Sequence, residues 1–311
     1  MADAVRAPSN RERFLRLMAG GSLDRGIFAN RGGSLDEWRP LWVSQGMPAD
    51  FDFGFGFCFG DTLEALEVNL LFQPPFEIEV LEEEGQTQVV LDQCGVIKRV
   101  FKGRPGELEQ FLEYPVADRA SWEALRPRLD ADEVDLDARL PADWAQRAAA
   151  LNEQSDAPVV FGCSHLCGFF SFLRELMGDR AYYAFYDAPD LVREILEVQV
   201  HRLTTLLARI ARDIRIDMQF IFEDMCYRNG PLVGPAPFRE FLLEPYQSTI
   251  AAAKECGVRA FCVHSDGQVD VLIPLWLEAA STCCGPWRWR RVPTWLGSRP
   301  PMKAYSYRWA A

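Results

Sequence analysis

The sequence predicts an α/β protein, and within that class a TIM-type (β/α)8 barrel. From residue 158 onward, short apolar strands alternate with amphipathic helices, and polar residues follow each strand, at 158–163, 217–222 and 258–263. This repetition is typical of (β/α) proteins, whose functional groups gather at the carboxyl ends of the strands. No G-x-G-x-x-G motif follows a strand, so a dinucleotide-binding fold has no direct support. The long helices and single-domain size favour the barrel over a doubly wound sheet.

The helices of this region follow from apolar periodicity and from proline and glycine positions. Pro189 opens a long helix over 189–210 at its first turn, with the apolar residues on one face. A helix over 235–257 is expected to be interrupted near Pro245, because proline cannot donate the intrahelical hydrogen bond. A further helix covers 269–279.

Residues before 158 predict N-terminal additions to the barrel. Asn10–Ala19 is expected to form an amphipathic helix with Asn10 as its N-cap. Alternating apolar and acidic residues with a turn at Glu84-Gly85 predict a β-hairpin region over 76–101. Residues 50–61 are expected to be extended, and 104–150 to form helices separated by prolines.

Composition narrows the classes of protein. The 311 residues hold 33 basic and 45 acidic side chains, a formal charge of −12, which argues against a general nucleic-acid or membrane-surface binder. No apolar run approaches the about 18 residues of a membrane helix, and the first residues lack a signal peptide's apolar stretch. Nine scattered cysteines indicate reduced thiols. We expect a cytoplasmic protein with a small-molecule substrate and no nucleic-acid or membrane partner; a homodimer remains open.

One cysteine grouping resembles a metal site. Cys163-Ser-His165-Leu-Cys167 brings two thiols and an imidazole together in sequence. Its spacing differs from the C-x2-C and H-x3-H patterns of zinc sites. We therefore expect small buried thiols where a strand meets a turn, and no metal.

The C-terminal residues differ from the rest of the chain. Residues 281–311 contain four tryptophans, six basic residues and no acidic residue, a charge of +6, whereas residues 1–280 carry −18. Such a tail could bind nucleic acid by stacking and charge. Back-translation with codons re-formed one nucleotide upstream offers another explanation, because it permits the string E-A-G-V-N-V-L-W-P-L-A-V-A-A-G-T-D-V-A. This string would end the preceding helix with a glycine and supply a buried strand. We therefore divide the chain into a barrel domain, 1–280, and an aberrant tail, 281–311, so that the barrel is incomplete or frame-shifted at its C-terminal end.

Two strand ends carry the candidate catalytic groups. Glu223 and Asp224 follow one strand, and His264 and Asp266 follow the next. Carboxylates at a barrel mouth can bind NH groups or move protons, and a histidine there titrates near neutral pH. We expect these four residues to form the catalytic set.

Several longer stretches can be compared with known families. They include Asn10-Arg-Glu-Arg-Phe-Leu, Asn229-Gly-Pro-Leu-Val-Gly-Pro235, Phe238-Arg-Glu-Phe-Leu-Leu-Glu-Pro-Tyr246 and His264-Ser-Asp-Gly267. Together these stretches resemble the uroporphyrinogen decarboxylase superfamily, which also contains cobalamin- and corrinoid-dependent methyltransferases. The resemblance covers most of the chain. It implies a TIM barrel with the active cleft at the carboxyl ends of the strands.

As an expectation, the resemblance implies a lyase, a metal-independent decarboxylase of an acidic tetrapyrrole or related acid, with no cofactor. Arg31 would pair with a substrate carboxylate, and Asp61 or the Glu223-Asp224 pair would stabilise the protonated intermediate. Tyr227 and Asn229 complete the expected substrate-binding set. The family's second N-terminal arginine is missing, and Asp61 matches the family's F-S-D segment only weakly.

Two alternatives stay open. The first is a corrinoid-dependent methyltransferase of the same superfamily, with zinc and a corrinoid as cofactors. The zinc site of that branch uses H-x-C, whereas Asp266 here stands two residues after His264. The second alternative is an inactive, truncated product.

Overall fold

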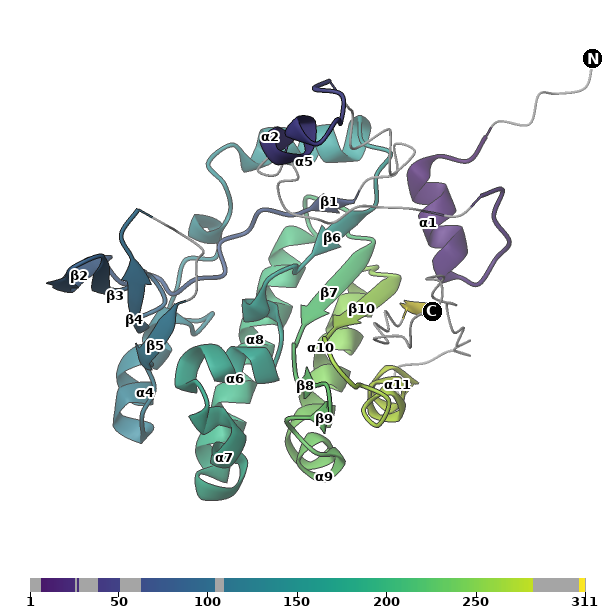
Figure 1. The fold of residues 1–311 in the computed structure, drawn as a ribbon. Coiled ribbons are helices and arrows are strands. Elements are labelled where there is room, and N and C mark those ends of the chain that lie inside the picture. Colours follow the sequence, from purple (N-terminus) through teal and green to yellow (C-terminus); the bar gives the residue numbers. More distant parts are fainter. Residues whose placement is uncertain are drawn as a thin grey trace, which may run out of the picture.

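The computed structural model describes residues 7–25, 27, 39–50, 63–103, 109–281 and 308–310. A central sheet has the order β1-β6-β7-β10-β11, and the first four strands run parallel (Figure 1). Its strands are β1 (Glu64–Ala65), β6 (Val159–Phe161), β7 (Met218–Phe222), β10 (Ala260–His264) and β11 (Arg308–Ala310), the last antiparallel to β10. The predicted α/β class with a parallel sheet is confirmed. The sheet does not close within the described residues, so the barrel remains a prediction.

Helices surround this sheet, and a second sheet lies beside it. The helices are α1 (Asn10–Met18), α2 (Arg39–Ser44), α4 (Arg119–Leu125), α5 (Trp144–Glu153), α6 (Phe170–Met177), α7 (Arg180–Asp187), α8 (Pro189–Ile210), α9 (Pro235–Pro237), α10 (Leu243–Glu255) and α11 (Ile273–Ser281). The second sheet contains β2 (Glu79–Glu84), β3 (Thr87–Leu91), β4 (Ile97–Phe101) and β5 (Gln110–Glu113), all antiparallel, and β8 (Cys226–Tyr227) pairs with β9 (Gly230–Pro231). None of the described helices is long and apolar enough to cross a membrane.

The two faces of the parallel sheet are buried in different ways. Phe161, Ile221 and Phe261 point into the main core, which also contains the apolar faces of α6, α8 and α10. Alternate residues such as Phe220 point to the opposite face, where a smaller cluster includes Phe14 of α1. In a closed barrel this second face would be the interior.

A buried ion pair anchors helix α1 to the amino-terminal ends of β6 and β7. The Arg11 guanidinium donates to Asp217 Oδ1 from Nε at 3.0 Å and from Nη2 at 2.5 Å. Asp217 Oδ2 accepts from the backbone N–H of Val159 at 3.0 Å, so one carboxylate joins the starts of β6 and β7 to α1. The helix N-cap is Ser9, in a capping box with Glu12, one residue before the expected Asn10.

The predicted interruption near Pro245 takes the form of a π-helical turn. Pro245 lies in the first turn of α10, and the residues before it, 238–242, form this turn between α9 and α10. A π turn hydrogen-bonds over five residues, so it accommodates the missing N–H and the steric bulk of proline. The regular α-helix is therefore interrupted just before Pro245, while the chain stays helical through it.

The region after the hairpin contains a strand that the sequence did not predict. Residues 76–101 form β2, β3 and β4, as an extended hairpin, and β5 adds a fourth strand where proline-separated helices were expected. All four residues of β5, Gln-Phe-Leu-Glu, are exposed. Because neither face of this strand is buried, its sequence does not show the alternation of apolar and polar residues that would predict a strand. The expected extended segment 50–61 lies outside the described residues except for its first residue.

Candidate functional site

The candidate site is a cleft at the carboxyl ends of β6 and β7, bounded by α6 and the β2–β5 sheet. Its cavity volume is 420 Å³, within the range of about 300–1,000 Å³ for small-molecule sites. We call it the strand-end cleft and define it by its described lining: Asp92, Cys94, Val96, Lys98, Glu109, Phe111, Tyr114, His165, Ser171, Arg174, Glu175, Gly178, Asp179, Phe222 and Asp224.

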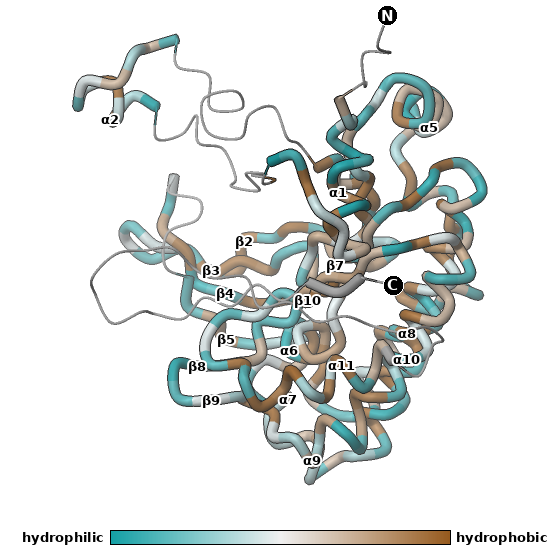
Figure 2. Tube along the Cα trace, turned by 90° about the vertical axis from the view of Figure 1, so that its right-hand side faces the viewer, coloured by the Kyte–Doolittle hydropathy of each residue, from teal (hydrophilic) through white to brown (hydrophobic). Residues whose placement is uncertain are grey.

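The segment that follows β5 packs against the carboxyl end of α6 and forms one side of this cleft. Both views show β5 beside α6 (Figure 1 and Figure 2), and the N–H of Val116 donates to Leu176 O at 2.9 Å. The Tyr114 ring lies on Gly178, where a Cβ would come within 2.2 Å of a ring carbon. Because Gly178 also has φ +59°, only glycine suits this end of α6.

Backbone strain marks the two strand ends that open into the cleft. Among the described residues, the only non-glycine positions with positive φ are Cys163, at +63°, and Asp224, at +44°. Each lies two residues after the last residue of its strand. Left-handed backbone costs an ordinary residue about 1–2 kcal/mol, and such strain concentrates at functional sites. The strain therefore supports this edge of the sheet as the functional edge.

Asp224 is the one sequence-predicted catalytic residue that lines the cleft. Arg174 Nη1 donates to the Asp224 backbone oxygen at 3.3 Å and lies 3.9 Å from its carboxylate Oδ2. The Asp224 side chain is 45% exposed, so its carboxylate is available to a ligand.

His165 and Glu175 form an imidazole–carboxylate pair in the same cleft, with 3.5 Å between Nε2 and Oε2. Burial raises the pKa of Glu175, while the charges of His165 and Arg174 act in the opposite direction. A carboxylate beside an imidazole can orient the ring and stabilise its protonated form. The pair therefore has the composition of a general base. Sequence analysis did not assign a functional role to either residue.

Lys98 and Cys94 have structural roles in the cleft. Burial lowers the pKa of Lys98, but hydrogen bonds to Glu109 and Asp92 outweigh it and raise the pKa; Lys98 Nζ lies 3.0 and 3.1 Å from their carboxylates. Burial raises the pKa of Cys94 to about 12. Because a thiol with that pKa stays protonated near neutral pH, Cys94 is not a nucleophile there.

Glu223 is fully buried and holds the start of α6. Its Oε1 accepts from Phe169 N at 2.9 Å and from Tyr246 Oη at 2.5 Å, and its Oε2 accepts from the N–H groups of Phe170 at 2.9 Å and Ser171 at 3.0 Å. Burial raises the pKa of Glu223, and these hydrogen bonds oppose that rise. Both oxygens are fully used, so Glu223 has no lone pair left for a substrate.

The other sequence-predicted residues lie outside the described lining of the cleft. His264 stacks on the far side of Phe222, at 4.8 Å between ring centroids, and its buried Nδ1 has no hydrogen-bond partner among the described residues. Asp266 and Asn229 are exposed, and Tyr227 is 67% exposed. Arg31 and Asp61 lie outside the described residues. Backbone hydrogen bonds from Glu223 and Asp224 to His264 O, at 2.8 and 3.3 Å, nevertheless join the two strand ends.

Two buried side chains of α8 position the turn that carries His165. Gln199 Nε2 donates to Leu166 O and Gly168 O at 2.9 and 2.8 Å. Arg202 Nη2 donates to the same Leu166 oxygen at 2.8 Å, and Nη1 donates to Leu70 O at 2.7 Å. Burial lowers the pKa of Arg202 to about 9. This network fixes the turn after β6, and with it the backbone of His165.

The donor set at this edge does not fit the zinc site of the methyltransferase branch. Within the part of the chain that the structure describes, only Asp130, Asp132 and His201 bring three metal-ligating atoms within 4.8 Å of one another. Cys163, His264 and Asp266 form no such group. We therefore derive no step through zinc.

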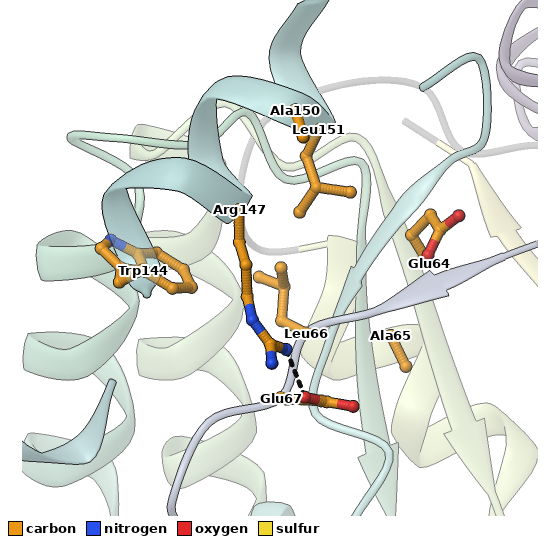
Figure 3. Close-up of a pocket in the computed structure, with 8 residues that line it drawn as sticks. All are labelled: Glu64, Ala65, Leu66, Glu67, Trp144, Arg147, Ala150 and Leu151. Atoms are coloured by element: carbon orange, nitrogen blue, oxygen red, sulfur yellow. Dashed lines mark hydrogen bonds and ion pairs between the residues drawn. The ribbon is translucent and has the colours of Figure 1, made fainter. Parts of the chain in front are cut away.

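A second pocket lies between β1 and α5. Figure 3 shows its lining, in which Arg147 forms an ion pair with Glu67. Its cavity volume is 280 Å³. The Trp144 indole at its edge donates to Asp213 at 2.7 Å, which ties α5 to the segment before β7. We assign this pocket a structural role, because Asp224, with its left-handed backbone, and the imidazole–carboxylate pair line the strand-end cleft instead.

Fold and site together define an α/β protein with a parallel sheet and a polar cleft at the carboxyl ends of its strands. No family model matches the chain, and no curated protein matches its sequence. Among solved structures, the fold is similar to a methyltransferase from Methanosarcina mazei, with a TM-score of 0.50 and 14% identity over 88% of this chain and 74% of that chain. At this identity the similarity concerns the fold.

Proposed function

We propose that this chain is an enzyme that transfers a methyl group to a small acceptor bound in the strand-end cleft. The observation that carries the proposal is the polar cleft at the carboxyl edge, where His165 and Glu175 form a base beside Asp224. The similarity in fold to a methyltransferase supports methyl transfer over the decarboxylase that the sequence resemblance favours.

The charge of the cleft also disfavours an acidic tetrapyrrole. Its described lining contains five carboxylates against the two permanent cations Lys98 and Arg174. Lys98 already pairs with two carboxylates, and Arg174 lies beside Asp224. A substrate with several carboxylates would meet like charge here, and like charges close together raise the free energy of binding.

The side chains of the cleft can perform the proton transfer that methylation requires. As the acceptor atom bonds to the methyl carbon, the bond to the donor breaks with its electron pair on the leaving group. The acceptor proton passes to the His165 imidazole, and the Glu175 carboxylate stabilises the imidazolium. Such a positioned base contributes about 10²–10⁴-fold to rate.

A corrinoid, which the sequence resemblance implies for a methyltransferase, would supply the methyl group as a cation equivalent when bound. The described cleft fits a small acceptor in size and does not fit a corrin macrocycle. We therefore treat the methyl donor as a second substrate and derive no step through it.

The test is an assay with methylcobalamin as methyl donor and a panel of small amines, thiols, alcohols and carboxylic acids, with methylated product measured by mass spectrometry. We expect product with at least one acceptor and a loss of about 100-fold or more in Glu175→Gln. Glu153→Gln, an exposed position at the end of α5, is the matched control and should keep full activity. Absence of methylated product, or release of CO2 from a tetrapyrrole acid, would contradict the proposal.

A further inference from the structure

The charges in the lining of the strand-end cleft indicate which class of small molecule it binds. Its cations are already neutralised, as Lys98 contacts Asp92 and Glu109 at 3.1 and 3.0 Å. Arg174, the other permanent cation of the described lining, lies 3.9 Å from Asp224 Oδ2, and its charge also acts on Glu175. Asp179 adds a further carboxylate to the lining. The described cleft therefore has an excess of negative charge.

Aromatic rings form another part of the wall. Phe111, Tyr114 and Phe222 all line the cleft, and the first two stack with ring centroids 5.9 Å apart and an interplanar angle of 25°. Burial raises the pKa of Tyr114, so the phenol stays neutral. Electron-rich ring faces attract organic cations through the cation–π interaction.

The spacing of the carboxylates favours an organic cation over a metal ion as the ligand of the cleft. Within the described residues, no three ligating atoms of the cleft approach within 4.8 Å of one another, whereas Mg²⁺ and Ca²⁺ need several oxygens at about 2.0–2.6 Å. A volume of 420 Å³ walled partly by rings suits a cation with an apolar body.

From the charge, the aromatic wall and the carboxylate spacing, we propose that the strand-end cleft binds a small primary or secondary amine as its ammonium ion. The ammonium group would lie between the Asp224 and Glu175 carboxylates, and its alkyl part would contact Phe111 and Tyr114. This inference rests on the proposed function, because it names the amine as the acceptor of the methyl group. The ammonium ion loses one proton to the His165–Glu175 pair, and the freed nitrogen lone pair forms the new bond to the methyl carbon.

Binding by isothermal titration calorimetry tests this without any methyl donor. The probes are butylammonium, 1-butanol and butyrate, which share an alkyl chain and differ in charge. We expect butylammonium to bind at one site, 1-butanol at least tenfold more weakly, and butyrate not measurably. Butylammonium affinity should also fall as salt is raised from 20 to about 200 mM, because ions screen partly exposed charges.

Two variants locate the site. Asp224→Asn and Glu175→Gln should each weaken butylammonium binding at least fivefold, whereas Glu153→Gln should leave it unchanged. Asparagine tolerates the left-handed backbone at position 224, and circular dichroism spectra that match the parent protein establish that each variant folds. Equal binding of butylammonium and butyrate, or unchanged affinity in both variants, would overturn the inference.

The outcomes also separate this inference from the proposed function. If butylammonium binds as described but no amine is methylated, the ammonium site stands and methyl transfer fails. If methylcobalamin methylates a thiol or alcohol while butylammonium does not bind, methyl transfer stands and the ammonium site is wrong.

Discussion

Replacing Glu223 by glutamine tests whether this buried carboxylate supports the fold or performs chemistry. The carboxylate accepts four hydrogen bonds, three of them from the backbone N–H groups of the α6 N-cap, Phe169, and of the first two helix residues, Phe170 and Ser171. Glutamine keeps one oxygen, which can satisfy two of these donors, and places an NH2 group against the other two. Each buried donor left unpaired costs about 1–3 kcal/mol, so Glu223→Gln, which leaves two unpaired, should lower the free energy of unfolding by about 2–6 kcal/mol.

Urea denaturation followed by circular dichroism and by fluorescence measures this loss. Tyr246→Phe is the matched comparison, since it removes one of the four donors and should cost less, about 1–2 kcal/mol. The reasoning would be refuted if Glu223→Gln changed stability by less than about 0.5 kcal/mol, the range of an ordinary surface substitution. Loss of turnover at unchanged stability would instead return Glu223 to the catalytic set that the sequence predicts.

Three further predictions concern other parts of the chain. Gly267→Ala should destabilise the protein by at least about 1 kcal/mol in urea denaturation, because Gly267 has φ +83° and a Cβ there would lie 2.6 Å from Tyr227 O; unchanged stability would contradict this. The Arg13 guanidinium beside Asp24 lowers the pKa of that carboxyl to about 2, so the stability that this ion pair provides is present above pH 4 and is lost as pH falls through 2. Asp24→Asn should therefore melt at a lower temperature than the parent at pH 6 and at the same temperature near pH 2. A difference in melting temperature that stays constant between these pH values would refute the assignment. If residues 281–311 are out of frame, sequencing of the coding DNA should show an open frame one nucleotide upstream that encodes the predicted glycine and strand, and a stop codon in that frame would exclude it.

Apolar periodicity predicted the elements that pack into the main core. Helix α8 begins at Pro189 and ends at Ile210, as its proline and apolar spacing indicate. Strands β7 and β10 lie where the sequence has short apolar runs followed by polar residues. The runs are continuously apolar because both faces of each strand are covered in the structure. Strand β5 was missed, since its exposed residues carry no such pattern.

The described lining of the strand-end cleft, the candidate site, was predicted only in part from the sequence. Asp224 could be found because it lies two residues after a buried strand. Glu175 and Arg174 lie on α6, where charged residues between core positions look like an ordinary solvated face. Their role depends on the β2–β5 sheet that packs beside them, and no local signal reports that contact. The signal for His165 was present, since it follows β6, but its neighbours Cys163 and Cys167 favoured the interpretation of buried thiols at a turn.

The most direct test of the central claim, that the strand-end cleft is the functional site, is a crystal structure of the protein grown with butylammonium. The account predicts ligand density in the cleft, with the nitrogen at hydrogen-bond distance, about 2.7–3.2 Å, from the carboxylate of Asp224 or Glu175. Ligand density outside this cleft, on the other side of Phe222 beside His264, would contradict it.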